Sequence, residues 1–320
     1  MPLFTDCIRF GFSLLRIDGR KIINAGFTRS FGAHLHVAHL AHRSQAAQSP
    51  AIPAQHRDTA GTAAVTNVYL LTDAARSLLV DTGPVAAQDL VLSWLADTLP
   101  DSSALCVAAL RMGEFDSIAN MLAVAARFPI KTIFGAQVDG LEWFDVHPEP
   151  TSPGALQDAV YQRMSSQAGI SLSDGRTVEA VQPLLRLLTT HWLYDPLTGS
   201  VFTSDAFSYA GDVGSDGDAW TVSAGSDAIT VDDVCRHLVR TRYWWLPGAD
   251  TRPISEWLEQ FFACHDVERI CPAHGAVLDG AGVVQRHVEL LLAALHRFRA
   301  EPRAYPFARA ATAAGGKVAR

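Results

Sequence analysis

The sequence predicts an α/β fold in which two β-rich halves pack face to face and helices cover their outer surfaces. Short apolar runs typical of strands come first in each half, and helical patterns follow them. The sequence shows no internal repeat with a period of roughly 20–50 residues, which argues against a solenoid or a propeller. The 320 residues are 48% hydrophobic and 18% charged, a composition that can supply the core of one large domain.

The first half is expected to contain short strands that alternate with helices. Residues 65–71 alternate and are rich in β-branched side chains, and residues 104–110 form a continuous apolar run typical of a buried strand. A stretch with apolar residues at helical spacing ends at Pro100. We expect strands at 65–71, 77–80, 104–110 and 130–134, and helices at 86–99 and 118–127.

The second half continues with a helix, strand pieces and a hairpin. Residues 176–190 give strand pieces that end at His191, and residues 195–199 form a turn of hairpin type. Amphipathic spacing and a final apolar stripe mark the later helices. We expect strands at 200–203 and 269–271, and helices at 155–165, 231–240, 254–262 and 283–297.

The two ends of the chain differ from its centre. Residues 1–60 contain five histidines, a Ser/Gln/Ala/Pro-rich stretch at 44–55 and little periodicity, so we expect a poorly ordered or atypical extension. The His-x-His-x-x-His run at 34–39 is an alternative metal site, although no Asp or Glu lies close to it. Residues 301–320 are expected to form a loose tail. The domain is therefore predicted to span residues 61–300.

Charge, cysteine content and hydropathy exclude several classes of protein. A net charge of −7 and a pI near 5.9 argue against nucleic-acid binding, which relies on basic residues. No uninterrupted apolar run of about 18 residues predicts a membrane span, and the first residues do not resemble a secretory signal. The five cysteines form no Cys-x-x-Cys pair, which excludes a zinc ribbon and fits a reducing compartment. We therefore expect a cytoplasmic protein.

Polar side chains follow the predicted strands at the points where the strands end. Because strand ends along one edge of a sheet sandwich converge on one cleft, such residues can meet in a single site. Ordinary structural roles remain alternatives, namely an acidic pair at a helix N-terminus, a helix cap, a packed strand end and a simple turn. The candidate residues are Asp81, Glu114, Asp116, His191, Asp205 and His274.

The order of these segments resembles the metallo-β-lactamase superfamily, and within it the flavodiiron proteins and the oxygen-binding diiron proteins. In that group the first motif is His-x-Glu-x-Asp-His, and the matching stretch here is Met-Gly-Glu-Phe-Asp-Ser at 112–117. The Asp-Thr-Gly turn at 81–83 also matches the superfamily. The remaining matches are His-Trp at 191–192, Ser-Asp-Ala-Phe at 204–207 and Cys-Pro-Ala-His-Gly at 271–275, so the resemblance covers roughly residues 65–298.

The resemblance implies a metallo-β-lactamase-type αββα sandwich that holds two divalent metal ions. Carried over by position, Glu114 and His191 would bind one ion. Asp116 and His274 would bind the other, and Asp205 would bridge the two. Two positions depart from the group, because Met112 and Ser117 stand where it has histidine ligands. A thioether is too soft for hard iron and a serine hydroxyl is a poor ligand, so the number of ions held is open.

Charge and ligand type agree with the implied site. Three carboxylates that face two divalent cations leave one positive charge, which a hydroxide would balance. Without a cation, converging carboxylates would repel one another and their pKa values would rise. Oxygen-rich ligation favours iron or manganese over zinc. We therefore expect two divalent ions, with iron as the first choice and manganese or zinc as alternatives.

Three functions follow from these expectations. The first is dioxygen binding or reduction at a diiron centre, with electrons from a separate partner, because the chain has no flavodoxin-like domain, cysteine pair or Gly-rich dinucleotide loop. The second is hydrolysis of an ester, thioester or phosphate by a metal-activated water that Asp116 would orient. The third is a degenerate, non-enzymatic module, which Met112 and Ser117 favour. The resemblance also implies a homodimer.

Overall fold

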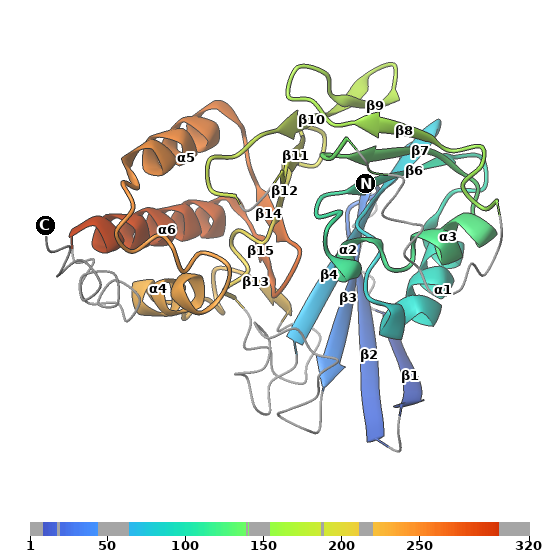
Figure 1. The fold of residues 1–320 in the computed structure, drawn as a ribbon, viewed down its shortest axis with the longest axis horizontal. Helices are drawn as coiled ribbons and strands as arrows, with labels where there is room; N and C mark the ends of the chain where they lie inside the picture. Colours follow the sequence, from blue (N-terminus) through green and yellow to red (C-terminus); the bar gives the residue numbers. More distant parts are fainter. Residues whose placement is uncertain are drawn as a thin grey trace, which may run out of the picture.

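The computed structural model describes residues 9–17, 20–43, 64–138, 140, 154–186, 189–210 and 220–300. Two β-sheets pack face to face, and helices cover the outer face of each (Figure 1). The first sheet has the strand order β1-β2-β3-β4-β5-β6-β7-β8. Its strands are β1 (Arg9–Ile17), β2 (Arg20–Phe31), β3 (Leu35–Arg43), β4 (Ala64–Leu71), β5 (Arg76–Val80), β6 (Ala104–Ala109), β7 (Ile130–Gly135) and β8 (Val160–Arg163).

The second sheet has the order β13-β15-β14-β12-β11-β10-β9. Strands β9 to β12 pair antiparallel with their sequence neighbours, whereas β12 runs parallel to β14. Its strands are β9 (Ile170–Ser173), β10 (Arg176–Val181), β11 (Trp192–Asp195), β12 (Ser200–Ser204), β13 (Thr221–Val222), β14 (Arg269–Pro272) and β15 (Val277–Asp279).

The helices form the two outer layers. Those of the first layer are η2 (Val85–Ala87), α1 (Gln88–Thr98), α2 (Phe115–Ile118) and α3 (Met121–Arg127). Those of the second are α4 (Val231–Arg240), α5 (Arg252–Cys264) and α6 (Ala281–Ala300). The layers therefore follow the order helix, sheet, sheet, helix, which confirms the expected αββα architecture. Within the described residues, no helix is both long and apolar enough to cross a bilayer.

Strands β5 and β6 are buried on both faces, which explains their continuous apolar runs. Leu78 and Val80 of β5 pack into the core between the sheets, whereas Leu79 faces the helices α1 and α3. In β6, Cys106 faces the other sheet and Val107 faces the helices. A strand sandwiched in this way has no polar face and shows no alternation in its sequence.

Strands β1, β2 and β3 all lie inside residues 1–60, the segment that is expected to be a poorly ordered or atypical extension, and β3 is the one that joins the other two to β4. The strand pairs antiparallel with both β2 and β4. Leu35 and Val37 are fully buried, and His39 is 2% exposed. Because both faces are covered, the strand lacks the alternation that would have predicted it. The low-complexity stretch 44–55 and the tail 301–320 lie outside the described residues, and the boundary at residue 61 stays a prediction.

The histidines of β3 have separate local partners. His36 contacts Ser30 Oγ at 2.8 Å and Thr72 Oγ1 at 3.2 Å through its two ring nitrogens. His39 lies three residues along, so it points to the opposite face of the strand. These positions do not support the alternative metal site in this run.

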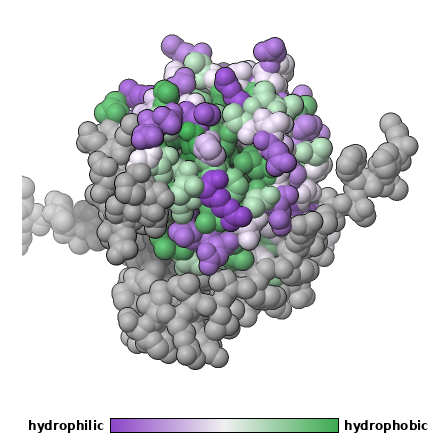
Figure 2. All heavy atoms as spheres, turned by 90° about the vertical axis from the view of Figure 1, so that its right-hand side faces the viewer, coloured by the Kyte–Doolittle hydropathy of each residue, from purple (hydrophilic) through white to green (hydrophobic). Residues whose placement is uncertain are grey.

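Residues 155–165 were expected to be a helix, and this prediction is wrong for the part that forms β8. Strand β8 pairs parallel with β7 at the edge of the first sheet, with Val160 opposite Thr132. This edge lies on the right-hand side of Figure 1. The same side faces the viewer in Figure 2, where the described surface is a mixture of hydrophilic and hydrophobic residues. A short, mostly exposed edge strand carries a mixed pattern that resembles an amphipathic helix.

Candidate functional site

The site forms where strands of both sheets end. Strands β5 and β6 are parallel, so the residues that follow them meet at one edge of the first sheet. Strands β12 and β14 are parallel as well, and they bring the segments after them to the matching edge of the second sheet. Asp81 and Ser204, at the ends of β5 and β12, have φ angles of +60° and +55°, which turn the chain sharply. An isolated bridge between Thr66 and His274 joins the sheets at this point.

The segment that carries His274 is held by side chains of the first sheet. Asn67 Nδ2 donates hydrogen bonds of 2.9 Å to the carbonyl oxygens of Pro272 and Gly275. The hydroxyl of Tyr69 donates to the Pro272 carbonyl at 2.6 Å. His39 Nδ1 contacts Asn67 Oδ1 at 2.7 Å, which fixes the orientation of the amide. The position of His274 therefore depends on strands β3 and β4.

Glycine is required at the end of this segment. Gly275 has φ +78°, and a Cβ at this residue would lie 2.8 Å from the carbonyl oxygen of Ala210. The Gly275 N–H also donates to the Val65 carbonyl at 3.1 Å. A side chain at this position would force apart two segments that are both hydrogen-bonded.

The guanidinium of Arg111 occupies the centre of the site. Its Nη1 lies 3.0 Å from Oε2 of Glu114 and 3.1 Å from Oδ2 of Asp116. The same atom lies 2.9 Å from Nε2 of His274 and 3.6 Å from Oδ1 of Asp205. The Arg111 side chain is 1% exposed. One nitrogen of a buried cation thus faces four of the five residues predicted as metal ligands.

Asp81 anchors the other end of this guanidinium. Arg111 Nη2 donates to Asp81 Oδ2 at 3.2 Å, and Asp81 Oδ1 accepts hydrogen bonds from the Leu110 N–H at 2.9 Å and from Ser117 Oγ at 2.5 Å. Burial raises the pKa of Asp81, although Arg111 and these hydrogen bonds oppose the rise. Ser117 therefore acts here as a donor to Asp81.

Asp116 lies on the first turn of α2, where its carboxylate contacts both Arg111 and His274. Oδ2 of Asp116 is 3.0 Å from Nε2 of His274 and 3.1 Å from Nη1 of Arg111. Burial works to raise the pKa of Asp116, but Arg111 and His274 hold it well below its ordinary value. This carboxylate is ionised and already engaged, so it is poorly placed to act as a free base.

Arg242 covers the site from the outer side. It follows helix α4, its two terminal nitrogens bind the carboxylate of Glu114, and its Nε lies 3.7 Å from Oδ1 of Asp205. The Arg242 side chain is 24% exposed. Burial and the nearby Asp205 raise the pKa of Glu114 to about 7, against the opposing effect of Arg111 and Arg242.

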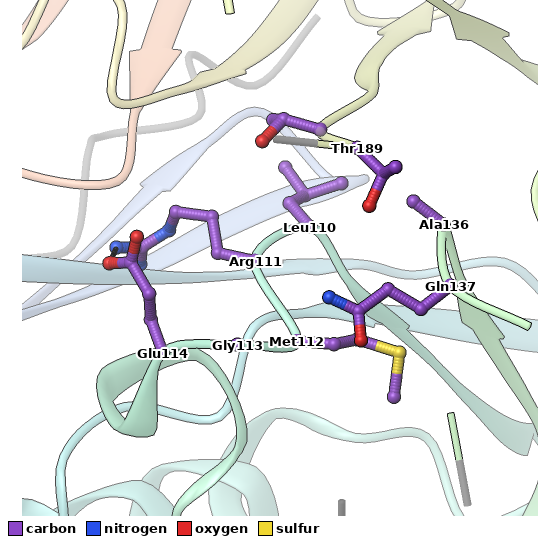
Figure 3. A pocket seen from close by; sticks show the side chains of 9 residues that line it. Leu110, Arg111, Met112, Gly113, Glu114, Ala136, Gln137 and Thr189 are labelled. Carbon is purple, nitrogen blue, oxygen red and sulfur yellow. Dashed lines mark hydrogen bonds and ion pairs between the residues drawn. The ribbon is translucent and has the colours of Figure 1, made fainter. Parts of the chain in front are cut away.

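Met112 points away from the cluster. Its Sδ accepts a hydrogen bond from the Tyr161 hydroxyl at 3.3 Å, and the side chain packs among the residues under α3. Figure 3 shows the side chain of Arg111 turned toward Glu114 while that of Met112 points to the opposite side. The position that holds a histidine in the resembled group therefore supplies no ligand to the cluster.

His191 is not among the described ligand residues whose atoms lie within 4.8 Å of one another. It is buried, and its Nδ1 has no hydrogen-bond partner among the described residues. Burial, together with the positive charges of Arg186 and Arg163, lowers the pKa of His191. The preceding residues Thr189 and Thr190 line a small pocket beside Arg111 and Glu114 (Figure 3), whose volume of about 20 Å³ is roughly that of one water molecule.

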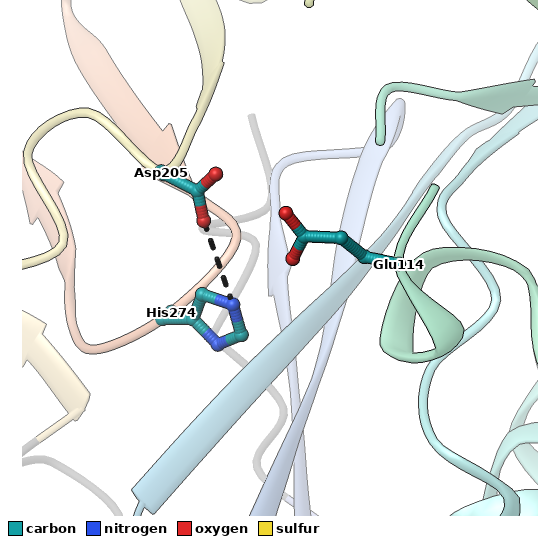
Figure 4. A group of neighbouring side chains, drawn as sticks. All are labelled: Glu114, Asp205 and His274. Atoms are coloured by element: carbon teal, nitrogen blue, oxygen red, sulfur yellow. Dashed lines mark ion pairs between the residues drawn. The ribbon is translucent and has the colours of Figure 1, made fainter. Parts of the chain in front are cut away.

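A smaller group of predicted ligands remains close enough to hold a metal ion. Glu114, Asp205 and His274 each offer a ligand atom, and these atoms lie within 4.8 Å of one another. Figure 4 shows the three side chains converging from separate segments, with an ion pair between Asp205 and His274. The donor set is one that iron, manganese or zinc accepts.

A pair of metal ions does not fit the side chains as they are arranged. Metal–ligand bonds to nitrogen and oxygen are about 2.0–2.2 Å long. Arg111 Nη1 already lies at 2.9–3.1 Å from ligand atoms of Glu114, Asp116 and His274, so no space remains among them for an ion. Met112 and Ser117 have other partners, in Tyr161 and Asp81, and His191 is not part of the group of ligand atoms within 4.8 Å of one another.

Sequence reasoning found the acidic residues and His274 but missed both arginines. Arg111 comes just after a buried strand, and its place shortly before Glu114 and Asp116 in the sequence was the signal that could have identified it. Arg242 follows a helix more than a hundred residues later and gives no such signal, because only the folded chain brings it to Glu114.

Comparison with solved structures relates the fold to flavodiiron cores. A fragment of diflavin flavoprotein A 5 from Nostoc sp. is 12% identical with a TM-score of 0.56, and the match covers 92% of this chain and 98% of that one. Rubredoxin oxygen:oxidoreductase from Desulfovibrio gigas is 17% identical with a TM-score of 0.52, over 89% of this chain and 62% of that one. The apo chemotaxis sensor ODP from T. denticola is 16% identical with a TM-score of 0.50, over 88% and 94% of the two chains.

These likenesses confirm the metallo-β-lactamase-type fold. The chain spans about three-fifths of the length of several of the solved chains that it matches. No protein-family model matches the sequence, and the search of curated proteins gave no significant match.

Proposed function

We propose that this chain is a metal-independent, non-enzymatic module of the metallo-β-lactamase fold, in which arginine side chains take the place of the metal ions. One observation carries the proposal. Nη1 of Arg111 lies within 3.6 Å of Glu114, Asp116, Asp205 and His274 at once. A buried cation with this many acidic neighbours does for the carboxylates what a metal ion would do, because it offsets their charge and satisfies their lone pairs.

The electrostatics of the cluster support a stable closed site. Asp81, Glu114, Asp116 and Asp205 provide up to four negative charges, and Arg111 and Arg242 provide two fixed positive charges. The raised pKa values of Asp81 and Glu114 reduce the remaining negative charge further. The acidic groups therefore have partners without any ion.

A diiron centre that binds or reduces dioxygen is the second candidate function. It is favoured by the group of Glu114, Asp205 and His274, whose ligand atoms lie within 4.8 Å of one another. It is also favoured by the fold shared with proteins whose names include an oxygen:oxidoreductase and a chemotaxis sensor. In this case Arg111 would leave the cluster, two ions with iron as the first choice would bind, and a separate protein would supply the electrons.

Hydrolysis by a metal-activated water receives less support from the geometry. It would require Asp116 to orient the water, but Asp116 is engaged by Arg111 and His274. No contact of the described residues favours this function over the other two.

Elemental analysis of the protein after anaerobic purification from iron-supplemented cells tests the proposal. We expect far less than one metal ion per chain and no change in visible absorption when the reduced protein meets air. Asp205→Ala, which removes a predicted bridging ligand, should have the same low metal content. Stoichiometric iron in the wild type, lost in Asp205→Ala, would overturn the proposal in favour of the diiron centre.

Two further expectations, a homodimer and a cytoplasmic location, remain predictions. Light scattering in solution measures whether two copies pair, as the resemblance implies. Fractionation of cells that express the tagged chain measures whether the protein is cytoplasmic.

A further inference from the structure

We infer that Arg111 is a built-in substitute for a metal ion, and that removal of this side chain alone opens a site for one divalent cation. The inference rests on the proposed function and adds the identity of the residue that excludes metals. Glu114, Asp116, Asp205 and His274 would be the ligands of the new site.

The geometry of Nη1 is that of an ion at the centre of a ligand shell. The atom is approached by three carboxylates and one imidazole from three segments of the chain, with Glu114 and Asp116 supplied by one of them. Three of the four distances are 2.9–3.1 Å, so a shift of roughly 1 Å in each side chain would give bonds of metal–ligand length. This combination of oxygen and imidazole donors suits Mn²⁺, Fe²⁺ or Zn²⁺.

Arg111, rather than Arg242, controls access to this position. Arg111 is 1% exposed and reaches the centre, whereas Arg242 is 24% exposed and contacts Glu114 and Asp205 from the outer side. The removal of Arg242 would leave the centre filled. The removal of Arg111 would leave a gap among Glu114, Asp116, Asp205 and His274, the four residues that surround its Nη1.

Asp81 would keep hydrogen-bond partners after the loss of Arg111. It keeps hydrogen bonds from the Leu110 N–H and from Ser117 Oγ. The unbalanced charge therefore falls on Glu114, Asp116 and Asp205, for which Arg242 is the other arginine partner among the described residues. A divalent ion together with Arg242 would balance these three carboxylates, and like-charge repulsion in the empty site would favour its binding.

The test is a metal titration of Arg111→Ala, Arg111→Lys and wild type with Mn²⁺ and Zn²⁺ by equilibrium dialysis. We expect one ion per chain in Arg111→Ala, and none in wild type or in Arg111→Lys, which keeps a cation in place. At an ion concentration of about 100 times the dissociation constant, the melting temperature of Arg111→Ala should rise by roughly 5–10 °C. The double variant Arg111→Ala, Asp205→Asn should lose most of this gain.

Arg176→Ala is the matched control. Arg176 is also buried, and it pairs with Asp195 at 2.7 Å and with Asp73 at 3.6 Å, but it contacts no imidazole among the described residues. Its removal should destabilise the protein without the gain of a bound ion. Equal metal binding by Arg176→Ala and Arg111→Ala would overturn the inference. The loss of any buried arginine would then be enough to create a metal site.

The other outcomes are distinct. A folded Arg111→Ala that binds no ion, beside a metal-free wild type, overturns the inference and leaves the proposed function in place. Metal in the wild type overturns the proposed function itself. If Arg111→Ala does not fold alone, Arg111→Asn is refolded with and without Zn²⁺. Folding that needs the ion supports the inference, and failure under both conditions overturns it.

Discussion

Arg111 lies two residues after β6, and its guanidinium meets Asp81 and Asp205, which follow strands β5 and β12, and Asp116 of helix α2. Met112 is buried among apolar residues, and Ser117 donates to Asp81. Arg111 and Ser117 thus form a hydrogen-bonded network with Asp81, in which Met112 takes no part.

Loss of Arg111 should be costly to the stability of the metal-free protein. Arg111→Ala leaves converging carboxylates without their cation, and the unpairing of a buried charge typically costs about 3–5 kcal/mol. Urea unfolding monitored by circular dichroism measures this change. Arg252, which is 65% exposed and pairs with Asp250 on the surface, is the control, and Arg252→Ala should unfold at nearly the wild-type urea concentration. Equal stability of Arg111→Ala and wild type without metal would contradict the role of Arg111.

Ser117 should matter for stability although it binds no ion. Ser117→Ala removes the 2.5 Å hydrogen bond to the buried Asp81 and should lower the free energy of unfolding by about 1–3 kcal/mol. Ser226→Ala, which removes an exposed hydroxyl bonded within a turn, should change it little. If both variants unfold alike, Ser117 does not hold Asp81 in the way described.

At the level of elements, strand β3 and the segment 272–275 are linked to the site by a chain of hydrogen bonds. His39 on β3 contacts Asn67 on β4, and Asn67 holds the backbone on both sides of His274. His39 also packs edge-on against Trp220, with ring centroids 5.6 Å apart. A strand outside the predicted domain boundary thus positions a residue of the site.

Burial of His39 should make the protein sensitive to mild acid. Burial lowers the pKa of His39 to about 4, against an ordinary value of 6.5. The folded state therefore binds this proton less readily than the unfolded state, and stability is lost as the pH falls from 6.5 toward 4, by up to about 3 kcal/mol. Urea unfolding at several pH values should show a smaller loss in His39→Gln than in wild type. Parallel pH dependence in both proteins would contradict this prediction.

Gly275 should tolerate no side chain. Gly275→Ala combines a left-handed φ with a close approach to the Ala210 carbonyl, and should lower the free energy of unfolding by more than about 1 kcal/mol. Gly280 has φ +105° but no atom within 4 Å of an added Cβ, so Gly280→Ala isolates the cost of the backbone conformation. Thermal unfolding of the two variants should place Gly275→Ala at the lower melting temperature.

The elements that could be predicted were those with a clear local pattern. Strands β5 and β6 and helices α5 and α6 have long apolar runs or helical stripes, and the structure confirms them within a few residues. Strand β3 could not be predicted because it is buried on both faces and rich in histidine and alanine. Strand β8 could not be predicted because its mixed pattern at a sheet edge carries no period-two signal.

At the scale of the whole molecule, the site depends on the alignment of two sheets. The Thr66–His274 bridge joins the sheets beside the cluster, and Arg176 joins them at another edge through the Thr72 carbonyl at 2.7 Å and Asp195 at 2.7 Å. The order of polar residues at strand ends was enough to predict that Glu114, Asp116, Asp205 and His274 meet. It could not predict what lies between them, because the filling of the site depends on which long side chains reach it.

A crystal structure measured at the iron and zinc absorption edges tests most directly whether a guanidinium stands where metal ions would bind. Crystals of the wild-type protein grown with excess Fe²⁺ or Zn²⁺ should show the Arg111 side chain between Glu114, Asp116 and His274, with no anomalous peak among them. Anomalous peaks bonded to these side chains, with Arg111 turned out of the site, would contradict the account.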